Sequence, residues 1–130
     1  MTKIDAIVST KAPLAIGPYS QAIVADGIVY TAGVIPIDPE TKEIAGTDIR
    51  TQAERVLRSL AGLLEDAGSS LELVVKTTCF LQDLADFPAF NEVYARFFAG
   101  EHPPARSTVQ VAKLPMGVLV EVEAIALRRG

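Results

Sequence analysis

The sequence is poor in the residues that disulfides and zinc centres require. It contains one cysteine, Cys79, and one histidine, His102. A single cysteine cannot form an internal disulfide, and this pair cannot supply the ligand cluster of a structural zinc site. Cys79 lies in an apolar stretch, so we expect a small buried core residue. His102 stands in a loop before Pro103, where a solvated side chain is expected.

Excess positive charge and long apolar runs are also missing. Twelve basic residues face 16 acidic ones, for a formal net charge of −4, so nothing draws the chain electrostatically to nucleic acid or to an anionic membrane. The N-terminus lacks an apolar run of signal-peptide length, and no stretch approaches the roughly 20 apolar residues of a membrane span. We therefore expect a soluble, cytoplasmic protein that binds neither nucleic acid nor membrane.

What the sequence has in abundance is apolar residues, which make up 49% of its 130 residues. The length fits one domain, 1–130. So much apolar area on a short chain is typical of a protein that buries some of it against a partner subunit.

The pattern of apolar and turn residues predicts an α+β domain. Asp26-Gly27 is a strong hairpin signal between two strands. Apolar residues from Ile49 to Ala67 recur with helical period, with Thr47 or Asp48 as the cap and Gly68 at the end. The other expected elements are strands over 4–8, 73–81, 106–111 and 118–127, and a second helix capped by Asp86 and ending at Gly100. Their order predicts a mixed sheet with two helices packed on one face.

The last expected strand carries large apolar residues on both of its faces. Val120, Val122 and Ala124 point one way, and Leu119, Ile125 and Leu127 point the other. If the helices cover one face, the second must meet another subunit, because a bare apolar sheet face promotes aggregation.

Three charged residues interrupt this apolar C-terminal region. Arg106 follows Pro103-Pro104 at the start of one strand, and Glu121 and Glu123 lie on one face of the next. Charged side chains are rarely buried unless they are paired or functional, so the pattern indicates either a site for a small anionic ligand or an ion pair between strands.

The sequence resembles the RidA (YjgF-type) family of reactive-intermediate deaminases over essentially its whole length. The segments that carry the resemblance are Pro104-Ala105-Arg106-Ser107, Leu114-Pro115, 120–126, 15–22, 31–36, 75–78 and 91–94. The resemblance implies a chorismate-mutase-like fold and a homotrimer with ligand sites in the clefts between subunits.

The resemblance also implies an activity, the hydrolysis of reactive 2-imino and enamine acids, such as 2-aminoacrylate and 2-iminobutanoate, to 2-oxo acids and ammonia. Arg106 would hold the substrate carboxylate, and Glu121 would position and activate water, while Glu123 is more plausibly structural. The remaining implied substrate-binding residues are Tyr19, Gly33, Asn91 and Thr108. Such a reaction requires no metal or organic cofactor.

Thr108 departs from the family pattern, because many relatives have cysteine two residues after the arginine. A thiol nucleophile or redox switch is therefore excluded at this position. The backbone N–H of Thr108 can still donate a hydrogen bond to a carboxylate.

Two other functions remain open on the sequence alone. The chain could be a trimeric, non-catalytic sensor of small carboxylates that uses the same Arg106. RNA cleavage has been attributed to relatives, but the acidic charge balance and the lack of a basic stripe disfavour it.

Overall fold

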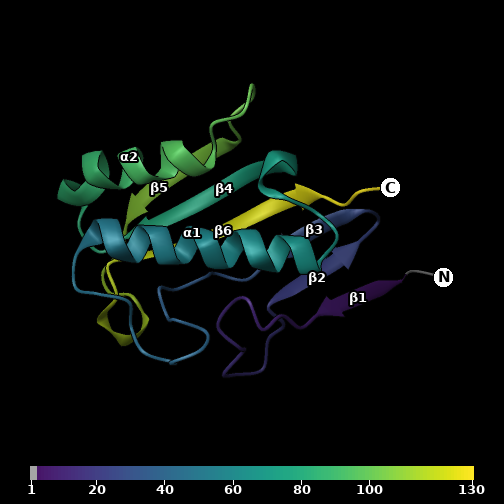
Figure 1. Cartoon of the computed structure of the whole chain (residues 1–130), viewed down its shortest axis with the longest axis horizontal. Helices are drawn as coiled ribbons and strands as arrows, with labels where there is room; N and C mark the ends of the chain where they lie inside the picture. The colour runs from purple at the N-terminus through teal and green to yellow at the C-terminus, as the bar shows by residue number, and fades with distance from the viewer. Residues whose placement is uncertain (1–2) are drawn as a thin grey trace.

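The computed structural model describes residues 3–130 as one mixed sheet with two helices on one face (Figure 1). The strands are β1 (Ile4–Ile7), β2 (Ala22–Ala25), β3 (Ile28–Thr31), β4 (Val74–Leu81), β5 (Ala105–Gln110) and β6 (Val120–Leu127), and the helices are α1 (Ile49–Asp66) and α2 (Phe87–Phe97). Short 3-10 turns cover Leu71–Leu73, Leu84–Asp86 and Pro115–Gly117. The strand order is β1-β2-β3-β6-β4-β5, which confirms the predicted α+β class.

The β2–β3 hairpin forms where the turn signal predicted it. Asp26 and Gly27 have φ values of 50° and 74°, the paired positive values of a primed two-residue turn. This turn sets the antiparallel register that pairs Ala25 with Ile28. β3 then pairs with β6, which brings the N-terminal hairpin beside the C-terminal strand.

Helix α1 covers the centre of the sheet with its apolar face. Asp48 caps its first turn by accepting a hydrogen bond from the Thr51 N–H at 3.0 Å. Gly68, just past its end, has φ 83°, the left-handed conformation that commonly ends helices. The buried side chains of α1, among them Val56, Leu57 and Leu60, pack into the core under β6.

Helix α2 starts directly after Asp86, as predicted, but its capping and its end differ from the prediction. Asp86 occupies the cap position, but its side chain makes no capping hydrogen bond; Asp83 instead accepts one from the Ala85 N–H in the preceding 3-10 turn. The helix ends at Phe97 and not at Gly100. The 3-10 turn runs directly into α2, so the backbone of Asp86 is itself helical, with φ −81° and ψ −3°, and lacks the extended conformation that an N-cap residue usually has.

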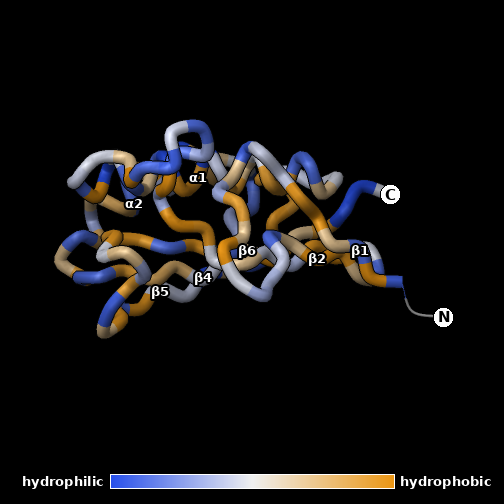
Figure 2. The backbone as a smooth tube through the Cα atoms, turned by 90° about the horizontal axis from the view of Figure 1, so that it is seen from below, coloured by the Kyte–Doolittle hydropathy of each residue, from blue (hydrophilic) through white to orange (hydrophobic). Residues whose placement is uncertain are grey.

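Both helices lie on the same side of the sheet, as Figure 2 shows edge-on. The alternation in β6 follows from this layering: Val120, Val122 and Ala124 are buried on the helix side, while Glu121, Glu123 and Ile125 are only partly covered on the other side. The uncovered face retains large apolar side chains: Leu127 of β6 is 46% exposed, and Tyr30 of β3 is 44% exposed. The two-sided character predicted for the last strand is therefore confirmed.

Strand β5 forms one edge of the sheet and pairs in parallel with β4. The chain returns to the sheet from α2 through β5, which places Arg106 beside α2. Within residues 3–130, no helix is both long and apolar enough to cross a membrane.

Candidate functional site

The guanidinium of Arg106 is held in place by three side chains of α2. It lies 4.6 Å from the ring centroid of Tyr94 and 5.2 Å from that of Phe87, and its Nη1 donates a hydrogen bond to Asn91 Oδ1 at 2.8 Å. Cation–π contacts of this kind orient an arginine without neutralising it. No carboxylate of residues 3–130 forms an ion pair with Arg106. The alternative of an ion pair with Glu121 or Glu123 inside one chain is therefore wrong.

The aromatic support of Arg106 was not predicted from the sequence. Phe87 and Tyr94 belong to the apolar stripe of α2, where core packing is the ordinary expectation. Tyr94 is anchored in turn, because its hydroxyl shares a hydrogen bond of 2.8 Å with the buried Thr77 Oγ1. Thr77 is also the residue of β4 that pairs with Arg106. The only sequence signal for this support was a helix with aromatic residues that comes just before the strand carrying Arg106.

Thr108 lies on β5 two residues from Arg106 and on the same side of the strand. Its Oγ1 is buried and has no hydrogen-bond partner among the described residues. Val111 donates its N–H to Leu81 of β4, and these donors alternate in direction along a strand. The N–H groups of Arg106 and Thr108 therefore point to the free edge of the sheet, where they can donate to a ligand.

Cys79 pairs with Thr108 across β4 and β5. It is fully buried, as predicted. Burial raises the pKa of its thiol to about 11, so the thiolate that nucleophilic or redox chemistry requires does not form near neutral pH.

Glu121 lies on the sheet face that no helix covers. Burial, and secondarily the neighbouring charge of Glu123, raise the pKa of its carboxyl group above the usual value. No hydrogen bond or ion pair holds its side chain within residues 3–130. An unpaired, half-buried carboxyl group with a raised pKa has the properties of a proton-transfer group. Glu123 lies on the same face, opposite Thr78 of β4.

Gly33 supplies the surface against which Glu121 lies. A Cβ at position 33 would stand only 1.8 Å from Glu121 Oε2 and 2.7 Å from its Cδ. The strand at this point is irregular: the next residue, Val34, exchanges backbone hydrogen bonds with Val122 of β6 at 2.8 and 3.1 Å. This pairing brings the main chain of Gly33 into close contact with the Glu121 carboxylate. A glycine within a strand often marks such a close approach.

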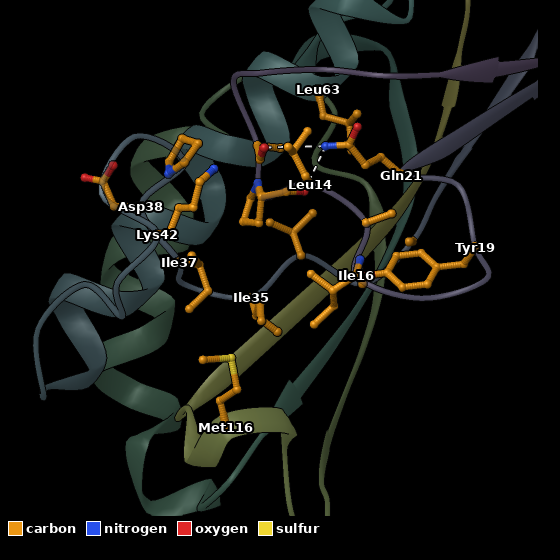
Figure 3. Close-up of a pocket in the computed structure, with 17 residues that line it drawn as sticks. Leu14, Ile16, Tyr19, Gln21, Ile35, Ile37, Asp38, Lys42, Leu63 and Met116 are labelled. Carbon is orange, nitrogen blue, oxygen red and sulfur yellow. Dashed lines mark hydrogen bonds between the residues drawn. The ribbon is translucent and has the colours of Figure 1, made fainter.

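Tyr19 and Gly33 line one cavity of about 440 Å³ (Figure 3). Tyr19 lies at its border, where its side chain is half exposed and its hydroxyl accepts a long hydrogen bond of 3.4 Å from the Ile16 N–H. Within the described part of the chain, no group of three or more His, Cys, Asp or Glu side chains is placed to hold a metal ion.

The predicted site residues fall into two groups that do not meet within one chain. Arg106, Asn91 and Thr108 lie at the β5 edge, where Arg106 faces the helices. Glu121 lies against Gly33 and faces away from the helices. Arg106 pairs with Thr77 while Glu121 pairs with Phe80, three residues along β4. Two strand spacings and three residues each correspond to about 10 Å, so one small ligand cannot touch both within a single chain.

Replacing Gly33 with alanine should displace Glu121 and leave the fold intact. Gly33 has no positive φ, so alanine adds no backbone strain, and the new Cβ collides only with the movable end of a side chain. If Glu121 performs proton transfer, a displacement of about 1 Å should lower turnover by roughly 10²-fold. Steady-state kinetics and thermal unfolding of the variant check this. Unchanged turnover in a folded Gly33→Ala protein would remove Glu121 from the reaction.

Comparisons with known proteins match nearly the whole chain. The family described as Endoribonuclease L-PSP matches residues 9–128. A RutC family protein of Pyrococcus abyssi is 52% identical over 124 residues, which cover 95% of this chain and 97% of the relative. Reactive Intermediate Deaminase A, chloroplastic, of Arabidopsis thaliana is 44% identical, over 95% of this chain and 66% of the plant protein.

Solved structures share the fold over nearly the whole chain. The crystal structure of E. coli TdcF with bound serine has a TM-score of 0.91 and 42% sequence identity, and the match covers 96% of this chain and 99% of that one. RidA from a Psychrobacter species has a TM-score of 0.90 and 43% identity, over 95% and 98% of the two chains. Together with the match over residues 9–128, these likenesses place the chain in the RidA (YjgF-type) family, which carries the Endoribonuclease L-PSP description.

Proposed function

We propose that the protein hydrolyses small 2-imino acids and their enamine tautomers, such as 2-iminobutanoate and 2-aminoacrylate, to 2-oxo acids and ammonia. The observation that carries this proposal is the unpaired Glu121 carboxyl group, whose pKa is raised and which lies against the main chain of Gly33. A relative with 44% identity is named a reactive intermediate deaminase. Arg106, oriented by α2 and free of any carboxylate partner in the described chain, supplies a site for the substrate carboxylate.

We further propose that the site forms between chains of a homotrimer. Within one chain Arg106 and Glu121 lie on different sides of the sheet, so a ligand that contacts both needs a second chain. The uncovered sheet face, on which Glu121, Tyr30 and Val109 lie, offers the apolar surface for that contact. Three subunits in a ring would place the β5 edge of one chain against the Glu121 face of the next.

In this assembly the chemistry needs only water as a co-reactant. Arg106 binds the carboxylate through its planar fork, and the outward N–H of Thr108 adds a donor. The Glu121 carboxylate takes a proton from water as the water oxygen bonds to the imine carbon, which gives a carbinolamine. The protonated Glu121 returns this first proton to the nitrogen. The regenerated carboxylate then takes the hydroxyl proton of the carbinolamine and passes it to the nitrogen as the C–N bond breaks, so that ammonia and the 2-oxo acid leave.

A trapping assay tests this function. A pyridoxal-phosphate-dependent threonine or serine dehydratase generates the imine, and semicarbazide competes for it with hydrolysis. We expect the protein to lower semicarbazone formation in proportion to its concentration, since acid–base help is worth about 10²- to 10⁴-fold. No change with a folded protein would contradict the proposal. Binding of 2-oxobutanoate without any change in rate would support a carboxylate sensor.

The endoribonuclease description of the family gains no support from the charge of this chain. Its formal net charge is −4, and binding to RNA depends strongly on clustered cationic side chains. We expect no cleavage of a single-stranded RNA by the same preparation that hydrolyses imines.

A further inference from the structure

A hydrogen bond between two buried hydroxyl groups joins α2 to β4 beside Arg106. The Tyr94 hydroxyl and Thr77 Oγ1 are 2.8 Å apart, and the two residues are 7% and 0% exposed. Helix α2 lies over the β4–β5 side of the sheet (Figure 1), so this bond runs from the helix layer to the sheet layer. Buried polar groups cost free energy unless they are paired, and here each hydroxyl group satisfies the other.

The Tyr94 ring is held both by packing and by this bond. Phe90 and Phe98 stand one helical turn before and after it, with ring centroids 5.7 and 4.5 Å from that of Tyr94. Apolar packing restricts the ring but has no preferred direction. The hydrogen bond to Thr77 has one, so it determines how the ring is oriented between the helix and the sheet.

The guanidinium of Arg106 rests on the Tyr94 ring. Its Cζ lies 4.6 Å from the ring centroid, and Arg106 is also the β5 partner of Thr77. A shift of the ring would therefore move the surface on which the guanidinium lies. Burial raises the pKa of the Tyr94 hydroxyl group above its usual value, so a phenolate that would neutralise Arg106 does not form near neutral pH. The positive charge stays available to a carboxylate.

The same row of β4 residues lies beside the second expected donor to the carboxylate. Cys79 is the β4 partner of Thr108, as Thr77 is of Arg106, and Cys79 Sγ lies 4.0 Å from Thr77 Oγ1. Threonine is rarely buried completely, because its hydroxyl group then needs a partner. A fully buried Thr77 that is bonded to the residue under Arg106 therefore indicates a role for the hydroxyl group itself.

Building on the proposed function, we propose that Thr77 and Tyr94 are positioning residues of the carboxylate site. Their hydroxyl bond fixes the Tyr94 ring, and the ring fixes the plane of the Arg106 guanidinium before the substrate arrives. Both residues act through Arg106 and not on the reacting atoms. Ordering one long side chain during binding costs about two- to tenfold in affinity, and a guanidinium that is already oriented avoids this cost.

Three variants separate positioning from stability. Tyr94→Phe and Thr77→Val each leave one buried hydroxyl group without its partner, so each should lower the unfolding temperature. The double variant Thr77→Val/Tyr94→Phe removes both groups, so much of the lost stability should return. We expect the Kd of 2-oxobutanoate, measured by calorimetry, to rise about five- to tenfold in all three variants. In the trapping assay KM should rise in parallel and kcat should not change, because the carboxylate is bound alike in the ground state and the transition state.

Ser69→Ala is the control for the loss of a buried hydroxyl bond elsewhere. Ser69 is 1% exposed, and its Oγ donates to the Leu127 carbonyl at 2.6 Å. Leu127 ends β6 and pairs with β3, not with the strands that carry Thr77 and Arg106. We expect Ser69→Ala to lower the unfolding temperature and to leave the Kd of 2-oxobutanoate unchanged.

The double variant decides between positioning and bracing even if neither single variant folds. Recovered stability together with a weakened Kd would support positioning. Recovery of both stability and the wild-type Kd would show that the bond only braces the fold, and would overturn the inference. A fall in kcat at constant KM would also overturn it, because Tyr94 would then act on the chemistry. If the wild type does not accelerate imine hydrolysis but the variants still bind 2-oxobutanoate more weakly, the proposed function is wrong and the positioning of Arg106 stands.

Discussion

Replacing Arg106 with alanine should lower kcat/KM for imine hydrolysis by about 10²- to 10³-fold, the usual cost of removing one partner of a buried charge pair with a bound ligand. Arg106→Lys should recover little of this loss. A guanidinium can lie flat against Tyr94 and Phe87 and donate hydrogen bonds to Asn91 and to a carboxylate at the same time. A lysine ammonium is a point charge and cannot do both. The trapping assay measures the kinetics, and thermal unfolding shows whether the fold persists.

Arg96→Ala is the control for this prediction. Arg96 also lies on α2, but it pairs with Glu54 at 3.5 Å in an exposed ion pair. Exposed pairs contribute little to stability, so neither folding nor kinetics should change. Wild-type kinetics in Arg106→Ala would show that the carboxylate binds elsewhere. Loss of folding in that variant would show that Arg106 mainly braces α2 against β5.

Replacing Glu121 with glutamine should lower kcat by about 10²- to 10⁴-fold, the usual contribution of acid–base catalysis, while the binding of 2-oxobutanoate is retained. Glutamine keeps the shape against Gly33 but cannot exchange a proton. Glu123→Gln is the matched control, because it removes a like charge from the same face without touching Gly33. A larger loss of kcat in Glu123→Gln than in Glu121→Gln would reverse the two roles.

The raised pKa of Glu121 gives this prediction a pH dependence. The folded protein holds the Glu121 proton more tightly than the unfolded chain does, so the contribution of this group to stability is present at low pH. This contribution is lost as the pH rises through the pKa that Glu121 has in the folded protein, which lies above 4.5. Glu121→Gln avoids the charged form and should therefore unfold at a higher temperature than the wild type at pH 7. The difference should shrink towards pH 4. A lower unfolding temperature for the variant at pH 7 would mean that the charged form is favoured in the fold.

Local patterns were enough to predict most of the fold. The turn at Asp26-Gly27 and the period of α1 are properties of neighbouring residues, and both appear where the sequence indicates them. The predicted end of α2 was wrong by three residues. A glycine such as Gly100 marks the last point at which a helix is expected to end, and this helix ends before it. Asp86 holds the predicted cap position, but its side chain makes no capping bond because its backbone is already helical.

The arrangement of the site depends on pairing between distant strands, which no local pattern records. Arg106 faces α2 because β5 pairs with β4 in the register that sets Arg106 beside Thr77. Glu121 faces the other way because its partner on β4 is Phe80. A shift of one residue in either register would reverse the face, since side chains alternate along a strand. The sequence therefore identified the charged residues but could not show that a single chain keeps Arg106 and Glu121 apart.

Mixing two inactive variants tests the central claim, a hydrolytic site shared between neighbouring chains, most directly. Arg106→Ala and Glu121→Gln are unfolded together, refolded as a 1:1 mixture and assayed for imine hydrolysis. If each site takes Arg106 from one chain and Glu121 from the next, random assembly of trimers leaves about one site in four with both residues intact. We expect about a quarter of the wild-type activity in the mixture and almost none in either variant alone. A mixture no more active than the separate variants would contradict the shared site.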